Sequence, residues 1–226
     1  MNDTDTMQTT KTRLLQAALA HVPFDGWSDA TLSAAITDSQ TAPALARALF
    51  PRGGIDLALA YHAAGDQQLR DTVAGTDMAA LRYRDRIATA IRLRLQLADR
   101  ECVRRGAALF ALPQNAAAGS RALWSTADTI WTALGDTSTD LNWYTKRVSV
   151  SGVYAATLLF WLGDDSADQH ATWEFLDRRI ENVMSFEKAK ASFRENPLGK
   201  AFMAGPMKVL ERIHAPKRAD DLPGKV

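Results

Sequence analysis

Apolar residues recur at helical spacing along nearly the whole chain, and this pattern limits the possible folds more than any other feature. Leu14, Leu15 and Ala18 follow it near the N-terminus, and Ile87 and Ile91 follow it further along. No segment shows the convincing alternation of apolar and polar residues that is typical of a β-strand. The sequence therefore predicts an all-α fold.

Helix starts and stops divide the first third of the chain into long, short, short and long helices. Ser28 is a good N-cap for the helix that follows it, and Pro43 suits the first turn of the next one. The segment "PRGG" at 51–54 then separates this short helix from a long one. This order predicts a helix-turn-helix-like headpiece at 9–75, and the helical pattern beyond it predicts a bundle at 76–190.

Charge bears on whether such a headpiece binds DNA. The 226-residue chain has a formal charge of +1, but residues 1–75 contain five Lys and Arg against eight Asp. The short helix that would read bases offers Arg47, with Arg52 just beyond it. DNA binding depends on neutralising phosphates. We therefore expect no DNA binding, although a DNA-binding transcriptional regulator with a hydrophobic ligand pocket remains the alternative function.

Signatures of catalysis are sparse. The chain contains no G-x-S-x-G, Walker A or G-x-G-x-x-G motif, and its single Cys102 excludes a multi-cysteine zinc site. One Glu-x-x-His pair, Glu211 and His214, occurs near the C-terminus, whereas di-iron bundles use that pair twice. The other histidines, His62 among them, have no partner at ligand spacing and are expected on helix surfaces. We predict no metal, no cofactor and no catalytic residue.

The segment "LNWYTKR" at 141–147 opens an apolar helix that we expect to end near residue 162, with Asp140 as its cap. The helix is apolar over most of its circumference, which is typical of a central position in a bundle. Only its first turn, with Trp143, Tyr144, Lys146 and Arg147, is then expected at the surface. The two rings and two cations suit a buried brace, a stacking platform for nucleic acid, or a docking surface.

An amphipathic pattern marks residues 193–215. On a helical wheel, its apolar and basic residues separate into two faces despite Pro206. A last helix packed on its own core would show the same apolar face, but the basic face favours contact with an anionic membrane surface. The predicted membrane-contacting residues are Leu198, Lys200, Phe202, Met203, Met207, Lys208, Val209, Leu210, Arg212 and Ile213. Residues 216–226 are expected to form a flexible polar tail.

The longest apolar stretch, at 148–162, is shorter than the roughly 20 residues that span a bilayer. The first residues, "MNDTDTMQTTK", contain no apolar core of a signal peptide. We therefore expect a bacterial-type cytoplasmic protein.

Three blocks carry a resemblance to a known family: "LFPRGG", "GDTSTDLNWYTKR" and "TWEFLDRRIENV". They resemble the coenzyme Q (ubiquinone) biosynthesis lipid-binding proteins with a TetR-like fold, in their alphaproteobacterial form, over residues 11–216. The resemblance implies a non-catalytic homodimer, peripherally associated with the inner membrane. It would bind an isoprenoid, quinone or phospholipid ligand and present quinone precursors to the di-iron demethoxyubiquinone hydroxylase.

The resemblance also implies roles for individual residues. Trp143 and Tyr144 match a surface patch for the hydroxylase, and the predicted partner-binding residues are Asn142, Trp143, Tyr144, Lys146 and Arg147. Large apolar residues on the inner stripes of the bundle could form a dry core, but the resemblance favours a lipid cavity. The predicted lipid-pocket residues are Leu109, Phe110, Trp124, Trp131, Tyr154, Leu158 and Trp161.

Overall fold

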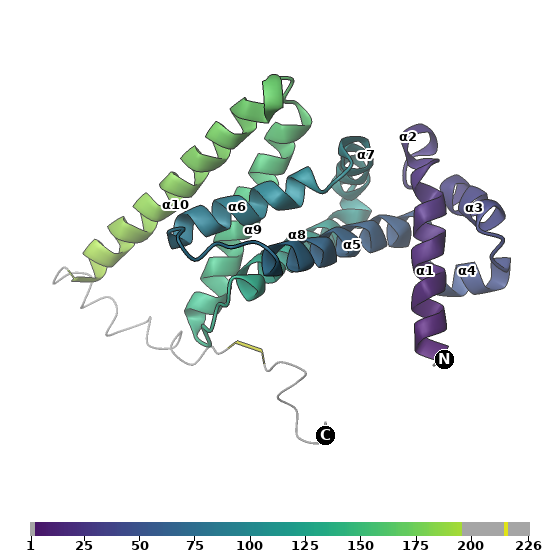
Figure 1. Cartoon of the computed structure of the whole chain (residues 1–226), viewed down its shortest axis with the longest axis horizontal. Helices are drawn as coiled ribbons and strands as arrows, with labels where there is room; N and C mark the ends of the chain where they lie inside the picture. The colour runs from purple at the N-terminus through teal and green to yellow at the C-terminus, as the bar shows by residue number, and fades with distance from the viewer. Residues whose placement is uncertain (1–2, 196–214, 217–226) are drawn as a thin grey trace, which may run out of the picture.

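The structure, a computed structural model, describes residues 3–195 and 215–216 (Figure 1). Most of the predicted membrane-contacting segment and of the predicted tail lies outside these described residues. The roles predicted for Leu198, Lys200, Phe202, Met203, Met207, Lys208, Val209, Leu210, Arg212 and Ile213 therefore stay predictions. The Glu211 and His214 pair also lies outside them.

The described part of the chain is all-helical, as the sequence predicted, and residues 3–195 contain no strand. Two single 3-10 turns, at Pro113–Asn115 and Ala167–Gln169, precede α8 and α10. The helices are α1 (Asp3–Leu19), α2 (Val22–Asp25), α3 (Asp29–Asp38), α4 (Pro43–Leu49), α5 (Gly54–Ala74), α6 (Tyr83–Gln96), α7 (Arg100–Ala111), α8 (Ala116–Ala133), α9 (Leu141–Leu162) and α10 (His170–Glu195).

Side-chain caps set the starts of three helices. Ser28 Oγ accepts a hydrogen bond from Thr31 N at the start of α3, which confirms the predicted cap. Asp140 Oδ1 accepts from Asn142 N at the start of α9, so α9 begins and ends where the sequence placed it. Asp99 caps α7 in the same way, through Cys102 N. Each cap satisfies a backbone N–H that the first helical turn leaves without a partner.

The first four helices pack around one apolar core. α1 packs against α3, α4 and the start of α5, and Figure 1 shows it crossing α5 near the N-terminal end of that helix. Leu14, Val22 and Leu57 are fully buried in this core. The order of long and short helices predicted for 9–75 is present.

Two glycines allow α5 to start close beneath α3. Gly53 has a φ of +56°, and a Cβ built on it would lie 1.8 Å from Asp29 Oδ1. A Cβ on Gly54 would lie 2.3 Å from the carbonyl oxygen of Trp27. Any other residue would force α5 away from the α3 cap. The "GG" of "PRGG" therefore positions the helix that supplies His62 and Asp66 to the site described below.

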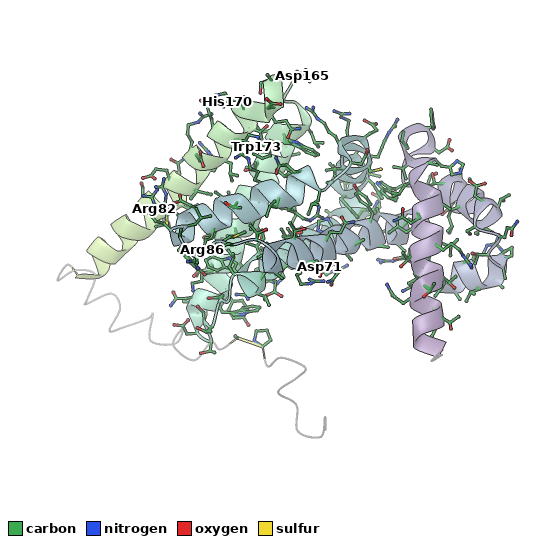
Figure 2. All side chains as sticks on the ribbon, viewed as in Figure 1. Asp71, Arg82, Arg86, Asp165, His170 and Trp173 are labelled. Atoms are coloured by element: carbon green, nitrogen blue, oxygen red, sulfur yellow. The ribbon has the colours of Figure 1, made fainter. Side chains whose placement is uncertain are left out.

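A second core joins α5 to the C-terminal helices. α5 packs on α6 and α8, α8 packs on α9, and α10 covers α9 and α6, as Figure 1 shows. Ile91, Ile130 and Tyr154 are buried at its centre. Trp173, labelled on α10 in Figure 2, belongs to the same core, and its indole N–H donates to Asp168 O.

One face of α9 lies open, contrary to the expectation that this helix is enclosed all round. Val150, Tyr154 and Trp161 are buried on one face of the helix. Val148 and Leu159 point the other way and are 59% and 65% exposed. Helical periodicity separates the two faces but does not show that the neighbouring helices of one chain cover only one of them.

Within the described residues, no helix combines the length and the apolar character needed to cross a bilayer.

Candidate functional site

A cavity of about 340 Å³ lies between α5, α7, α8 and α9. A volume of this size falls at the lower end of the range for small-molecule sites in proteins. Its walls are mostly apolar and include many alanines, so that the helices leave space between them. The lining residues are Trp27, Ala58, Tyr61, His62, Arg94, Cys102, Val103, Gly106, Ala107, Phe110, Ala111, Ala116, Gly119, Ser120, Ala122, Leu123, Tyr154, Ala155, Leu158 and Leu159.

The cavity has an exposed mouth and a buried end. Ala116 and Leu159 line it and are exposed, whereas Ala122 and Tyr154 line it and are buried. Ala116 and Ala122 both belong to α8 and are separated by about 9 Å along the helix axis, at about 1.5 Å per residue. The cavity thus runs inward along the first two turns of α8.

A buried ion pair stands at the inner end. Arg94 Nε donates to Asp66 Oδ1 at 2.9 Å, and the two side chains are 3% and 2% exposed. Arg94 Nη2 also donates to the carbonyl oxygen of His62. The guanidinium lies directly against Gly65, where a Cβ would come within 2.7 Å of it. Replacing a buried pair by apolar residues of similar volume is often neutral or stabilising. Stability alone therefore does not explain this pair.

His62 and Thr126 extend the pair into a network. His62 Nε2 lies 2.9 Å from Ala122 O and 2.7 Å from Thr126 Oγ1, and the carbonyl can only accept. Nε2 therefore carries the proton. Thr126 Oγ1 in turn donates to Asp66 Oδ1 at 2.8 Å. Burial lowers the pKa of His62, and the opposite effect of Asp66 does not outweigh it. The network is then neutral overall, with one anion, one cation and an uncharged imidazole.

Two buried polar groups at this end lack partners among the described residues. Asp66 Oδ2 accepts no hydrogen bond, although Asp66 is 2% exposed. Tyr154, 1% exposed, lines the cavity, and none of the hydrogen bonds within the described part of the chain involves its hydroxyl. Burial raises the pKa of Tyr154, which keeps the phenol protonated and able to donate. Buried polar groups normally have partners.

Three of the seven predicted lipid-pocket residues, Phe110, Tyr154 and Leu158, line this cavity. The other four do not line it, because residues on one helical stripe pack against different neighbours along its length, and their role in lipid binding stays a prediction. Trp161 is buried in the second core, where its indole donates to Gln169 Oε1. Leu109 packs against the first core, and Trp124 and Trp131 lie in the features described next.

His62, Asp66 and Arg94 were not predicted as site residues. The expectation that His62 lies on a helix surface is wrong, since it lines the cavity and contacts Thr126. The only local signal is the spacing of His62 and Asp66, four residues apart on α5. Arg94 comes from α6, and nothing in the sequence pairs it with Asp66.

The first turn of α9 forms an aromatic patch, which we define as Trp124, Trp143 and Tyr144. All three rings are half-buried. Trp143 and Tyr144 meet edge to face, with centroids 4.7 Å apart, and both rest against Trp124 of α8. Asn142, beside them, is exposed. The rings are therefore neither fully buried braces nor free side chains, since each packs against the other two and keeps part of its surface exposed.

The two cations of "LNWYTKR" have different positions. Lys146 Nζ bonds Asp136 Oδ1 and Ser138 Oγ, and its side chain is 34% exposed. Arg147 is fully buried, bonding Asp128 and Asp136, with its guanidinium 3.9 Å from the centroid of Trp143. The expectation that both cations lie on the surface is wrong for Arg147. It supports the aromatic patch from beneath and presents no surface to a partner.

Asp136 should make stability depend on pH in the acid range. Burial of Asp136 acts to raise its pKa, but hydrogen bonds from Lys146, Ser138 and Arg147 outweigh it and lower the pKa to about 2. An unfolded Asp titrates near 3.9. The charged carboxylate of Asp136 therefore stabilises the folded state by about 2–3 kcal/mol. This stabilisation is complete above about pH 4 and is lost as pH falls through about 2.

Urea unfolding between pH 5 and pH 2 should show this loss. The free energy of unfolding of Asp136→Asn should be lower at pH 7 and should change less between pH 5 and pH 2. An equally steep change with pH in this variant would contradict the role assigned to Asp136.

A second cavity, of about 280 Å³, lies between α6, α9 and α10, beside the aromatic patch. Trp131 lines it, and so do Asn142 and Lys146 of the predicted partner-binding set. The indole N–H of Trp131 donates to Lys146 O, and Lys146 Nζ lies 5.1 Å from the centroid of the Trp131 rings. This cavity and the aromatic patch thus share the first two turns of α9.

α4, the short helix that would read bases in a DNA-binding protein, is poorly suited to bind DNA. Arg47 lies in the last turn of α4, and Arg52, just beyond it, is held by Asp56 through three hydrogen bonds. An arginine that is already paired with a carboxylate would gain little further stabilisation by contacting a DNA phosphate. Within the described residues, no three His, Cys, Asp or Glu side chains lie close enough together to hold a metal ion.

Comparisons with known proteins point to one family. Residues 116–187, which form α8, α9 and most of α10, match the COQ9 family model. The mitochondrial ubiquinone biosynthesis protein COQ9 of Xenopus tropicalis is 34% identical over 183 residues, which are 76% of this chain and 57% of that protein. Its namesakes from Rattus norvegicus and Homo sapiens are 30% and 29% identical over 204 residues, 86% of this chain.

This chain spans 57% to 64% of the length of these three relatives. The matched region contains the aromatic patch and the walls of the cavity that α8 and α9 supply, but neither His62 nor Arg94. The chain is thus related to the COQ9 family, and residues 116–187 are the part that matches the family model itself.

Proposed function

We propose that this chain is a non-catalytic lipid-binding protein of ubiquinone biosynthesis. It would bind an isoprenoid or quinone-precursor lipid in the larger cavity and present it to demethoxyubiquinone hydroxylase. The relatives' shared name, ubiquinone biosynthesis protein, supports the pathway. The proposal also assigns the chain to the alphaproteobacterial form of the family, with a TetR-like arrangement of its helices.

The larger cavity is the observation that carries the proposal. It offers about 340 Å³ between mostly apolar walls, and its mouth is open beside Leu159. Burying a hydrocarbon chain there would contribute about 0.8 kcal/mol for each methylene removed from water. Stacked large side chains could have filled this space, but alanines and glycines line much of it instead.

The aromatic patch is the proposed docking surface for the hydroxylase, a di-iron enzyme. Trp143 and Tyr144 would supply anchor area, because large aromatic residues held in place are typical hot spots. Asn142 and Lys146 would add polar contacts at the rim. Lys146 is suited to this because its side chain keeps 34% of its exposure despite its bond to Asp136.

Membrane contact is proposed for residues 193–215. The separate apolar and basic faces of this sequence support the proposal, because apolar burial and attraction to anionic lipids add at a membrane surface. Ala215, the described residue at the end of this segment, donates its N–H to Thr139 O in the loop before α9. The proposed location is the inner face of the bacterial inner membrane, as a peripheral protein.

A homodimer is proposed through α9. Val148 and Leu159 are exposed apolar residues on the open face of this helix, with Gly152 between them. An exposed apolar stripe on a central helix is typical of an interaction surface. Because Leu159 also lines the cavity mouth, a second copy bound there would shield the entrance.

Filling the cavity should weaken lipid binding. Ala107 lines the cavity and is half-buried, so Ala107→Trp would place an indole in the space that the lipid needs. An indole displaces several methylene-sized groups, so affinity for a quinone with a short isoprenoid tail should fall about tenfold or more. Isothermal titration calorimetry on the purified full chain measures this directly.

Ala108→Trp is the matched control, because Ala108 is the next residue on α7, is exposed and does not line the cavity. It should bind the quinone as the unchanged protein does. If the unchanged protein takes up no lipid, or if both variants bind equally well, the cavity is not the lipid site.

A further inference from the structure

The inner end of the larger cavity combines features that an apolar chain cannot satisfy. Tyr154 brings a protonated hydroxyl without a partner among the described residues, and it is 1% exposed. Arg94 lines the same end and uses Nε–H and one Nη2–H in the hydrogen bonds to Asp66 and His62. Its other three N–H groups make no hydrogen bond to any described residue. Leaving such donors against hydrocarbon costs free energy.

The charge of this end restricts the ligand further. Asp66 neutralises Arg94 at 2.9 Å, and His62 is uncharged, so the cluster offers hydrogen-bond donors without net positive charge. A phosphate placed there would be repelled by the buried carboxylate of Asp66, whose second oxygen accepts no hydrogen bond. A neutral acceptor, such as a carbonyl oxygen, meets no such repulsion.

From this juxtaposition we infer that the buried end is a subsite for the neutral, oxygen-bearing head of the lipid, with Tyr154 and Arg94 as its hydrogen-bond donors. This inference rests on the proposed function of the cavity and narrows it. The ligand class is a lipid whose head carries carbonyl oxygens, such as a benzoquinone. A phospholipid does not fit the buried end.

The inference also sets the direction of binding. The buried end lies about 9 Å inward from Ala116 along α8, and the walls between are apolar. The head would occupy the end beside Tyr154, and the hydrocarbon tail would extend toward the mouth at Leu159. The opposite orientation would put the tail against the free donors. The head is then shielded from water while it is carried, so transfer to an enzyme requires its withdrawal through the mouth.

Three probes with the same short prenyl tail distinguish the possible heads: a prenylated benzoquinone, the prenylated benzene that lacks the oxygens, and the prenyl monophosphate. Calorimetric titration of the full chain should rank the quinone first. Tyr154→Phe removes only the hydroxyl and keeps the ring packed, and it should weaken quinone binding about fivefold, as expected for one neutral hydrogen bond. Binding of the prenylated benzene should not change.

Tyr83→Phe is the matched control. Tyr83 is 43% exposed at the start of α6 and does not line the larger cavity. Its effect on quinone affinity should stay within about twofold, and melting temperatures would show that both variants fold.

Two outcomes would overturn the inference while leaving the lipid cavity intact. The first is equal affinity for the quinone and the prenylated benzene, and the second is tighter binding of the monophosphate. Unchanged quinone affinity in folded Tyr154→Phe would remove Tyr154 from the subsite. Failure of the unchanged protein to bind any of the three probes would count against the proposed function itself.

Discussion

Arg147→Met is expected to destabilise the folded chain by about 3–5 kcal/mol, the range found when one partner of a buried ion pair is removed. Arg147 is fully buried, and its guanidinium bonds both Asp128 and Asp136. Methionine would leave Asp136, itself 2% exposed at its side chain, with Lys146 as its remaining cation. Urea unfolding at pH 7 measures the loss.

Lys146→Met is the control for Arg147→Met, since it removes the other cation from the same carboxylate. The Lys146 side chain is 34% exposed, so its bond to Asp136 is partly screened and its loss should cost about 1 kcal/mol. A cost for Arg147→Met no larger than that of Lys146→Met would contradict the structural role assigned to Arg147.

Trp143→Ala is expected to weaken binding to the proposed hydroxylase partner by at least about 2 kcal/mol, which is roughly thirtyfold. Its cost in stability should be intermediate, about 1–2 kcal/mol, because the ring is half-buried against Trp124 and Arg147. Truncating a fully buried Trp costs about 3–5 kcal/mol. Partner affinity and melting temperature need to be measured on the same preparations.

Trp173→Ala distinguishes docking from packing. Trp173 is 8% exposed in the second core, so its loss should cost more stability than that of Trp143. Affinity for the hydroxylase, per folded molecule, should stay unchanged. If Trp143→Ala behaves in the same way as Trp173→Ala, the aromatic patch is a structural brace and not a docking surface.

Local signals in the sequence were enough to predict where α3 starts and where α9 starts and ends. Asp140 and Gly163 enclose α9, and the capping residue Ser28 marks the start of α3, because caps act on neighbouring backbone groups. Helical periodicity was likewise enough to predict an all-α fold, because it needs no knowledge of which helix lies opposite.

The site depends on contacts between distant residues, and there the sequence was less informative. Arg94 meets Asp66 across 28 positions, and Arg147 meets Asp128 across 19, so neither pairing has a local pattern. Arg147 was expected at the surface because burying a cation without an acidic partner is costly, and the sequence did not show that Asp128 and Asp136 are its partners. A cavity in the bundle was expected from the family resemblance, but the walls of the observed cavity include small residues such as Ala107 and Gly119, which patterns of large apolar residues overlook.

We propose that lipid held in the cavity is presented to the hydroxylase at the aromatic patch. The most direct measurement is the ratio of demethoxyubiquinone to ubiquinone in cells whose own copy is replaced by a variant, with protein abundance measured in parallel. Ala107→Trp and Trp143→Ala should each raise this ratio at normal abundance, while Ala108→Trp should leave it unchanged. A ratio that stays at the level of the unchanged protein in both Ala107→Trp and Trp143→Ala cells would contradict the account.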